Sequence, residues 1–232
     1  MPDRPSSTAQ LSTTVDRAGA LLRLLAQHPQ GLGITRLTKE LGTQRAPLYR
    51  ILQALIEHGL VRRDARKQYL LGVGTLELAR AYAAQFPSGI EAMLAALADE
   101  TGMTATLVSV SGEELTTAFA KVPSTSEAHV YTPPGFRHPS GRLSMRIALE
   151  ALAPPSDDDP EDVRDTRRLG YAVGHGEVVP SRYGAAAVVP GSGESGAILI
   201  VALVTLRDFE HTAIGEPLLR TARAIGHTFG TP

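Results

Sequence analysis

The sequence contains no cysteine. Disulfide bonds, thiolate zinc sites and a cysteine nucleophile are therefore excluded, and burial of apolar side chains must hold the chain together. A long hydrophobic run is also missing. The longest, residues 196–206, has eleven residues, about half of the roughly 20 that a membrane-spanning helix needs. The first ten residues, MPDRPSSTAQ, contain no hydrophobic signal segment. We expect a cytoplasmic protein with no membrane partner.

What the sequence does have is the balance of an ordinary globular protein, with 232 residues of which 43% are hydrophobic and 20% charged. The net charge of -1 conceals an asymmetry along the chain. Residues 1–86 carry 12 Lys and Arg against 6 Asp and Glu, whereas residues 87–232 carry 11 against 18. A basic first third suits a polyanion such as nucleic acid. The acidic remainder is better suited to solubility, self-association or a small ligand.

Residues 12–73 are predicted to form three helices and a hairpin, after a polar tail, residues 1–11, that we expect to be disordered. In the third helix, residues 44–58, apolar residues recur every three or four positions and must face a core. The opposite face presents Arg45, Ala46, Tyr49, Arg50 and Gln53. Two short alternating runs, 60–64 and 68–71, flank a basic three-residue tip and predict the hairpin. Together these elements predict a winged helix-turn-helix.

Such a domain suits double-stranded DNA. A helix fits the major groove, where Arg50 and Gln53 can reach guanine or adenine edges and Ala46 permits a close approach. The hairpin supplies cations for phosphates, namely Arg62, Arg63, Arg66 and Lys67. For Arg50 and Gln53, contact with phosphates or with solvent is the alternative to base contact, and the hairpin cations form a charge run of the kind that often is only solvated. The competing class of protein is a metabolite-sensing or scaffold module whose winged helix mediates protein contacts.

The rest of the chain predicts a second domain, residues 90–232, after a linker helix within residues 74–89. Its patterns indicate helices at 90–101 and 215–229 and strands at 104–110, 115–120, 185–189 and 197–204. This is an α+β fold with an antiparallel sheet, which can hold a small molecule. The apolar side of the linker helix carries Leu76, Leu78, Ala79 and Tyr82. That side either contributes to a dimer contact or packs within the monomer.

Catalytic and metal-binding motifs are missing. Residues 191–196 match G-x-G-x-x-G, but a predicted strand follows instead of a helix, so we expect a hairpin turn. The seven histidines lack ligand spacing, and neither a G-x-S-x-G elbow nor a phosphate-binding loop occurs. We predict no catalytic residues, no metal, no cofactor and no enzymatic activity.

Over most of its length the sequence resembles the isocitrate-lyase-regulator (IclR) type of bacterial transcription factor. The segments that carry the resemblance in the first third are TVDRAGALLRLLA, LTKELGTQRAPLYRILQALIEHGLVRRD and YLLGVGTLELA. Those in the remainder include LAALADETGMTATLVSVSGEE and RRLGYAVGHGEVVPSRYGAAAVVPG. The resemblance implies a DNA-binding transcriptional regulator with a GAF-like effector-binding domain. A homo-oligomer, dimer or tetramer, is expected because one recognition helix reads too few base pairs.

The resemblance also implies where a small-molecule effector lies, in a cup between the loop before the helix at Ala148, the segment 174–184 and the last strands. Here the sequence departs from the family, with Ser144-Met145-Arg146-Ile147 in place of a glycine-containing turn, and with few neutral polar anchors. Three alternatives stay open: a more apolar effector, an effector held by charged side chains, or lost sensing. His175 between glycines also suits a loop in solvent, and Arg146 and Arg182 also suit ion pairs with the acidic stretch 157–161. The candidate effector residues are Ser144, Arg146, His175, Arg182, Gly184, Leu199 and Val201.

Overall fold

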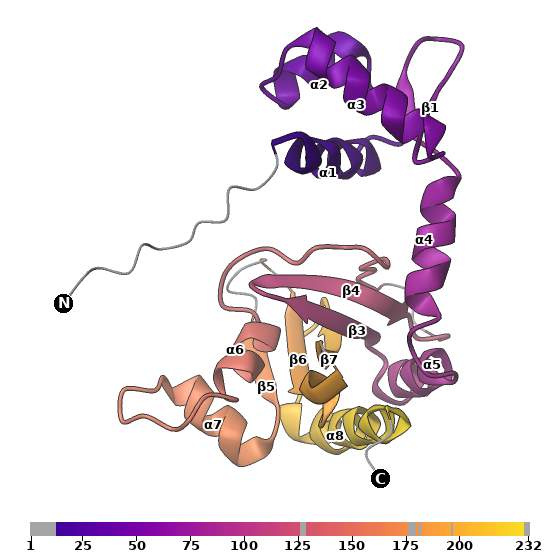
Figure 1. The fold of residues 1–232 in the computed structure, drawn as a ribbon. Coiled ribbons are helices and arrows are strands. Elements are labelled where there is room, and N and C mark those ends of the chain that lie inside the picture. Colours follow the sequence, from indigo (N-terminus) through magenta and orange to yellow (C-terminus); the bar gives the residue numbers. More distant parts are fainter. Residues whose placement is uncertain (1–12, 126–128, 176–179, 181, 196, 230–232) are drawn as a thin grey trace, which may run out of the picture. The chain divides into compact units, whose positions relative to one another are not determined.

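The structure is a computed structural model that describes residues 13–125, 129–175, 180, 182–195 and 197–229. The expected disordered tail, residues 1–11, lies outside these described residues. The chain divides into two compact units, residues 1–85 and residues 86–232, and each is considered by itself (Figure 1). The division falls a few residues before position 90, where the second domain is expected to start.

The first unit is a winged helix-turn-helix, as predicted. Its elements are α1 (Thr13–Ala26), α2 (Ile34–Glu40), α3 (Arg45–Glu57), β1 (Val61–Arg63), β2 (Tyr69–Leu71) and α4 (Gly74–Ala83). The two strands pair antiparallel, and Leu32 adds a single bridge to Tyr69. This bridge joins the connection between α1 and α2 to the hairpin, so the hairpin is hydrogen-bonded to the helical part of the unit.

The core of the first unit forms between α1, α2, α3 and the hairpin. The apolar side of α3 faces this core as its periodicity predicts, with Leu48, Ile51, Leu52 and Leu55 buried. At the end of α3 the chain makes a close backbone crossing. Gly72 donates its N–H to the carbonyl of Leu60, and a Cβ at Gly72 would lie 2.1 Å from the carbonyl oxygen of Gly59. Only glycine fits at this position without a shift of the backbone.

The second unit is built on one antiparallel sheet. Its elements are α5 (Ile90–Thr101), β3 (Thr104–Ser111), β4 (Glu114–Lys121), α6 (Ser144–Glu150), α7 (Glu161–Leu169), β5 (Ala172–His175), β6 (Tyr183–Val188), β7 (Ile198–Thr205) and α8 (His211–Thr228). The strand order is β4-β3-β7-β6-β5, and all neighbours pair antiparallel. The predicted α+β fold, with an antiparallel sheet and flanking helices, is confirmed.

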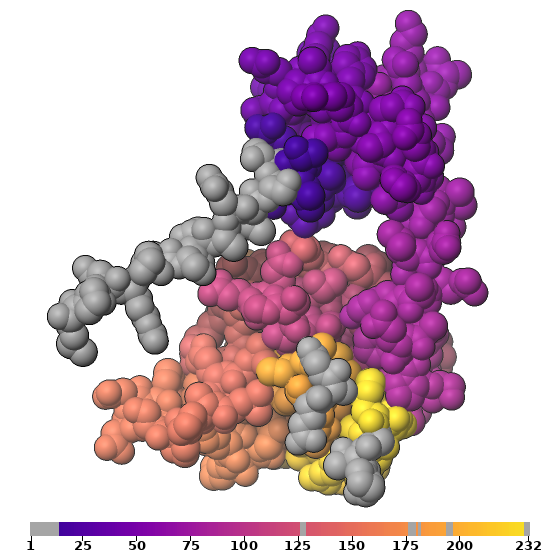
Figure 2. Space-filling view, viewed as in Figure 1, coloured from indigo at the N-terminus to yellow at the C-terminus, as the bar shows by residue number. Residues whose placement is uncertain are grey.

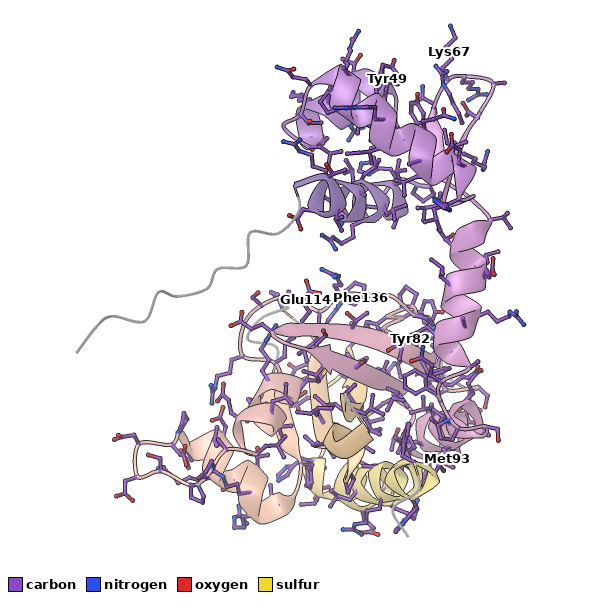
Figure 3. All side chains as sticks on the ribbon, in the orientation of Figure 1. Tyr49, Lys67, Tyr82, Met93, Glu114 and Phe136 are labelled. Carbon is purple, nitrogen blue, oxygen red and sulfur yellow. The ribbon has the colours of Figure 1, made fainter. Side chains whose placement is uncertain are left out.

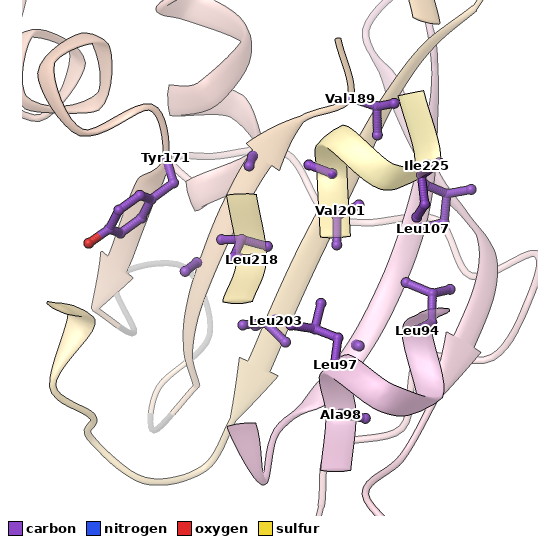
Figure 4. Close-up of a cluster of buried hydrophobic side chains, with 14 of the residues drawn as sticks. Leu94, Leu97, Ala98, Leu107, Tyr171, Val189, Val201, Leu203, Leu218 and Ile225 are labelled. Atoms are coloured by element: carbon purple, nitrogen blue, oxygen red, sulfur yellow. The ribbon is translucent and has the colours of Figure 1, made fainter. Parts of the chain in front are cut away.

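Each face of this sheet has its own core. One face packs against α5 and α8, with Leu94, Leu107, Leu218 and Ile225 fully or almost fully buried (Figure 4). The other face packs against α6 and α7 around Val108, Ile147, Val163 and Ile200. Successive residues of a strand point to opposite faces, so β7 contributes to both cores in alternation.

Two elements of the second unit, α7 and β5, were not among the predicted ones, and α8 starts before the expected residue 215. Pro217 lies inside α8, close to the expected start of the helix at residue 215. Its neighbour Gly215 has a packing role, because a Cβ there would lie 2.6 Å from the ring of Tyr171. The Tyr171 hydroxyl donates a hydrogen bond to the carbonyl of His211 at 3.0 Å, which fixes the start of α8 on the sheet.

Across the described ranges, no helix combines the length and the apolar character required to cross a membrane.

Candidate nucleic-acid interface and ligand pocket

The face of α3 opposite the core is exposed and carries the predicted groove-reading side chains. Arg45, Ala46, Tyr49, Arg50 and Gln53 are all exposed, and the exposed fraction of Tyr49 is 44%. Figure 3 shows Tyr49 on the outward side of α3, away from α1. An exposed large aromatic side chain between two arginines is typical of a contact surface rather than of a solvated helix face.

Two of these side chains already have hydrogen-bond partners that orient them. Arg45 Nη2 donates to Thr35 Oγ1 at 3.1 Å, which joins the start of α3 to the second helix. Gln53 Nε2 donates to Glu57 Oε1 at 3.0 Å, one helical turn further along. This bond holds the Gln53 amide along the helix surface. It uses the amide nitrogen and not the side-chain carbonyl oxygen. The Arg50 side chain makes no hydrogen bond within the described part of the chain, so its guanidinium is available to a partner.

The tip of the hairpin is shaped by Asp64 and Lys67. Asp64 Oδ1 accepts a hydrogen bond from the backbone N–H of Gln68 at 2.8 Å, and Lys67 adopts a positive φ of 64°, which is uncommon for a residue with a side chain. The result is a tight turn that stands out from the surface of the first unit (Figure 2). Arg62, Arg63, Arg66 and Lys67 are all exposed on it.

Arg63 differs from the other hairpin cations. Its guanidinium carbon lies 5.4 Å from the centre of the Tyr69 ring, a cation–π distance. Because Tyr69 is buried, this contact fixes Arg63 near the base of the hairpin, while Arg66 and Lys67 occupy its tip. The hairpin therefore presents cations at two levels along its length.

Helix α4 has no buried residue. Val73, which precedes it, is 78% exposed, and Leu76 and Leu78 are 67% and 59% exposed. Tyr82 is partly exposed as well. Several large apolar side chains on one short helix exceed the scattered exposure that is normal for a surface. Leu76 and Leu78 are thus not covered by the rest of the first unit.

The second unit contains a cavity that is partly open to solvent. It lies between the start of α6, the strands β5, β6 and β7, and the segment that follows β4. Its walls include Thr106, Thr132, Phe136, His138, Arg142, Leu143, Ser144, Met145, Gly174, His175, Arg182, Gly184, Ala202 and Val204. Gly174 allows the start of α6 to approach the sheet, because a Cβ there would lie 3.2 Å from the backbone nitrogen of Ser144. A Cβ at Gly184 would lie 2.7 Å from the carbonyl oxygen of Leu203 on the neighbouring strand.

Four of the seven predicted effector residues line this cavity: Ser144, His175, Arg182 and Gly184. Arg146 lies in the wall of a neighbouring hollow instead, which shares His138 with the cavity. Leu199 and Val201 belong to the core on the opposite face of the sheet, and Ala202 and Val204 line the cavity in their place. The residues of β7 predicted to face the cavity are thus one position away from those that do. Because successive residues of a strand point to opposite faces, a shift of one residue moves the predicted side chains to the other face of the sheet.

The sequence reasoning missed the polar groups that the segment after β4 brings to the cavity. Thr132 is 3% exposed, and its hydroxyl has no hydrogen-bond partner in the described part of the chain. His138 Nε2 shares a hydrogen bond with Thr117 Oγ1 at 3.0 Å. This segment lies along the β4 edge, where Thr117 bonds to Phe136 and Gly135. The only sequence signal was the Arg-His-Pro triplet at 137–139.

The acidic stretch 157–161 pairs with a different arginine from those expected. Asp159 accepts a hydrogen bond from Arg167 Nη1 at 2.5 Å, and this contact, the largest cause, holds the pKa of Asp159 below its ordinary value. Arg142 forms a two-pronged pair with Asp162, at 2.7 and 2.5 Å, and also contacts Glu150. These pairs fasten α7 to the start and end of α6, which keeps one wall of the cavity in place.

His138 gives the second unit a predicted pH dependence. Burial of its imidazole, followed by the charges of Arg182 and Arg146, lowers its pKa from 6.5 to about 4. The folded state therefore binds fewer protons than the unfolded state between these values, and stability present above pH 6.5 is lost as the pH falls toward 4. We expect a loss of about 1 to 2 kcal/mol between pH 7.5 and 5, after allowance for partial solvent screening.

Urea unfolding at the two pH values, followed by circular dichroism, measures this loss, and His138→Gln should remove most of it. Carboxyl groups with a lowered pKa, such as that of Asp162, change the stability only at more acidic pH. They therefore do not affect the comparison between pH 7.5 and pH 5. An equal loss in the variant and in the parent protein would contradict the assignment to His138.

The described residues contain no group of three or more His, Cys, Asp or Glu side chains arranged to hold a metal ion. Within the glycine-rich stretch 191–196, residues 192–195 form one turn of 3-10 helix, and strand β7 follows. Position 196 lies outside the described residues. The geometry is that of a turn between two paired strands and not of a strand that leads into a helix.

The fold and the two candidate sites define the class of protein: a winged helix-turn-helix with exposed cations on α3 and the hairpin, joined to an α+β unit with a partly open cavity. Residues 14–65 match the family model described as the IclR helix-turn-helix domain. Residues 14–65 are thus an IclR-type helix-turn-helix domain, and the chain as a whole has the fold of solved IclR regulators.

Among curated proteins, the chain is similar to the HTH-type transcriptional regulator TtgV of Pseudomonas putida, with 26% identity over 60% of this chain and 54% of that protein. It is 44% identical to the HTH-type transcriptional regulator Rv1719 of Mycobacterium tuberculosis over 25% of this chain and 23% of the other. The matches thus span about half or less of these relatives. A solved IclR transcriptional regulator from Alicyclobacillus acidocaldarius aligns with a TM-score of 0.80 at 20% identity, covering 94% of this chain and 99% of that one.

Proposed function

We propose that the protein is a transcriptional regulator that binds operator DNA through α3 and the hairpin and responds to a small molecule in its second unit. The observation that carries the proposal is the outer face of α3, where Arg50, Gln53 and Tyr49 are exposed opposite a fully apolar inner face. A helix with such a face fits the major groove, and the hairpin cations are suited to phosphates on either side of it.

The protein would act as a homodimer or a tetramer. The exposed apolar side chains of α4, among them Leu76 and Leu78, support a contact between two copies of this helix. A dimer places two recognition helices on successive half-sites, which multiplies the specificity that one helix supplies. Ligand binding in the second unit would then change the preferred separation of the two reading faces, and with it the affinity for a fixed half-site spacing.

The curated relatives are regulators by name, which supports a non-enzymatic role without a cofactor. A regulator that binds operator DNA acts in the cytoplasm, where we place this one. The competing proposal, a module whose winged helix contacts proteins, is tested in the same experiment. A gel shift with DNA from upstream of its own gene should show a sequence-specific complex at a physiological salt concentration, whereas a scaffold module should show none.

Replacing Arg50 with alanine should weaken operator binding by about 1 to 3 kcal/mol and relax the base preference at one position in each half-site. The reason is that a guanidinium in the major groove pairs with two acceptors on guanine, which alanine cannot do. Binding is measured by fluorescence anisotropy against a panel of single-base operator variants.

Arg223→Ala is a matched control, because Arg223 is also an exposed helical arginine but lies on α8 in the second unit. It should bind every operator variant like the parent protein. A uniform loss across all sequences for Arg50→Ala would reassign Arg50 to phosphate contact. If Arg50→Ala changes neither the base preference nor the affinity, Arg50 does not lie in the interface.

A further inference from the structure

The outward face of α3 carries a single acidic side chain, that of Glu57, in line with Arg50 and Gln53. The three residues are separated by three and four positions, so they lie on one stripe of the helix, and all three are exposed. A carboxylate near the phosphates of a duplex is repelled by them and opposes binding. Its place beside the proposed reading side chains therefore needs a compensating role.

The contact between Glu57 and Gln53 supplies such a role. Glu57 Oε1 accepts a hydrogen bond from Gln53 Nε2 at 3.0 Å. Because the acceptor is ionised, this bond is stronger than a bond between two neutral groups. Side chains four residues apart are neighbours on a helix surface, so the bond forms entirely within α3. It can therefore orient the Gln53 amide before a base arrives.

The direction of this bond is set by the chemistry of the two groups. A carboxylate only accepts hydrogen bonds, whereas a glutamine amide has a carbonyl oxygen that accepts and an NH₂ group that donates. If the Gln53 amide turned over, its Oε1 would face the Glu57 carboxylate, oxygen against oxygen. Glu57 therefore keeps the nitrogen of Gln53 on its own side and leaves the Oε1 acceptor to an external partner.

The bases differ in what they offer to such an acceptor. In the major groove adenine and cytosine each present an amino group, whereas guanine presents two acceptors and thymine presents one acceptor and a methyl group. An outward carbonyl oxygen pairs with a base amino group and is repelled by a base carbonyl. Arg50, one helical turn away, carries only donors and suits guanine. The two neighbouring side chains thus read opposite chemical patterns.

We propose that Glu57 is a positioning residue that fixes the Gln53 amide, so that Gln53 reads an amino base, adenine or cytosine, and rejects guanine and thymine at the same position. Without this restraint the amide turns over, and it then accepts from an amino base or donates to a carbonyl base with little preference. The inference rests on the proposed function, because it concerns the same reading face. It adds a base class and a residue that acts on DNA only through Gln53.

Fluorescence anisotropy with the full chain and a panel of single-base operator variants tests the assignment. The position that Gln53 reads is the one at which Gln53→Ala abolishes the base preference. At this position the parent protein should bind amino bases about 10-fold more tightly than guanine or thymine. Glu57→Gln should reduce this ratio to about 2-fold or less, because its amide can face either end of the Gln53 amide.

Two further variants separate positioning from charge. Removal of the Glu57 charge alone raises the affinity for every DNA sequence equally, because it removes a repulsion from phosphates. Asp16→Asn is the matched control, since Asp16 is an exposed carboxylate of the first unit on α1, and it should leave the base preference unchanged. The double variant Gln53→Ala with Glu57→Gln should show the same base preference as Gln53→Ala alone. Thermal melts monitor the fold of each variant.

The side-chain amide signals of Gln53 give a readout that needs no DNA. In proton–nitrogen NMR spectra of the free protein, one Gln53 amide proton should exchange with water more slowly than those of Gln44, an exposed glutamine without a side-chain capping bond. Glu57→Ala should abolish this difference. If the Gln53 and Gln44 amide protons of the parent protein exchange equally fast, Glu57 does not hold the Gln53 amide and the inference is wrong.

The DNA-binding outcomes distinguish this inference from the proposed function. Specific binding with a base ratio that Glu57→Gln leaves at the parent value would overturn the positioning role alone, and a parent preference for guanine or thymine would overturn the base class alone. A preference that survives Gln53→Ala but disappears with Glu57→Gln would mean that Glu57 reads the base itself, contrary to the inference. A parent protein that forms no sequence-specific complex would overturn the regulator and this inference together.

Discussion

Raising the salt concentration from about 50 to 200 mM should weaken operator binding by roughly 10³- to 10⁵-fold, if the dimer neutralises about 6 to 10 phosphates. Each chain offers exposed cations at both ends of its reading face: Arg45 and Arg50 on α3, and Arg62, Arg66 and Lys67 on the hairpin. Every phosphate contact releases condensed counterions from the duplex, and salt opposes that release. Fluorescence anisotropy over a salt series gives the slope of log affinity against log salt.

A double variant of the hairpin tip, Arg66→Gln with Lys67→Gln, should make that slope shallower by about 1 for each phosphate that is no longer neutralised, so by as much as about 4 in a dimer. Removal of a cation outside the first unit, for example by Arg223→Gln, should leave the slope as it is. Affinity that hardly responds to salt in the parent protein would contradict duplex binding. A steep slope that the tip variant does not alter would remove the hairpin from the interface.

Gly72→Ala should destabilise the first unit by about 3 kcal/mol or more. A Cβ at this position would meet only backbone atoms, at 2.1 Å from the Gly59 oxygen, 2.8 Å from the Gly59 carbon and 3.1 Å from the Leu60 carbon. Backbone at a crossing cannot move aside as a side-chain end can, so β2 must separate from the end of α3. Operator binding should fall with it, because this crossing fixes the hairpin relative to the recognition helix.

Guanidinium unfolding followed at 222 nm, with operator affinity measured on the same samples, checks this prediction. Gly19→Ala is the control. Gly19 lies inside α1, where a Cβ would meet only the flexible end of Arg23 at 3.7 Å, and alanine should stabilise the helix by up to about 1 kcal/mol. If both variants unfold at the same denaturant concentration as the parent protein, the close crossing has no energetic role.

The first unit was predictable from the sequence because its signals are local and redundant. The recurrence of Leu48, Leu52 and Leu55 identifies the inner face of α3, and the exposed face then follows from helical geometry. The alternation before and after the basic tip identifies the hairpin. What the pattern could not provide are contacts between side chains, such as Gln53 with Glu57 and Arg63 with Tyr69. The contacts of these side chains with DNA stay predictions.

In the second unit the signals are weaker. Helix α7 is nine residues long and buries only Val163 and Thr166. An ion pair between Asp162 and Arg142, which a local pattern does not reveal, joins it to the segment before α6. Strand β5 has four residues, one of which is a glycine. In β7 every residue from Leu199 to Leu203 is buried, and a continuous apolar strand does not reveal which residues face which side. Only the structure therefore shows which residues of β7 face the cavity.

The same strand makes the second unit tolerant of change in what it binds. Ala202 and Val204 form part of the cavity wall, whereas Leu199 and Val201 hold the sheet to α5 and α8. Because alternate positions serve separate compartments, a substitution that enlarges, narrows or polarises the hollow leaves the opposite packing layer intact. Under the proposed effector role, a lineage of such proteins can acquire new ligands through one or two codons of this strand while the scaffold persists unaltered.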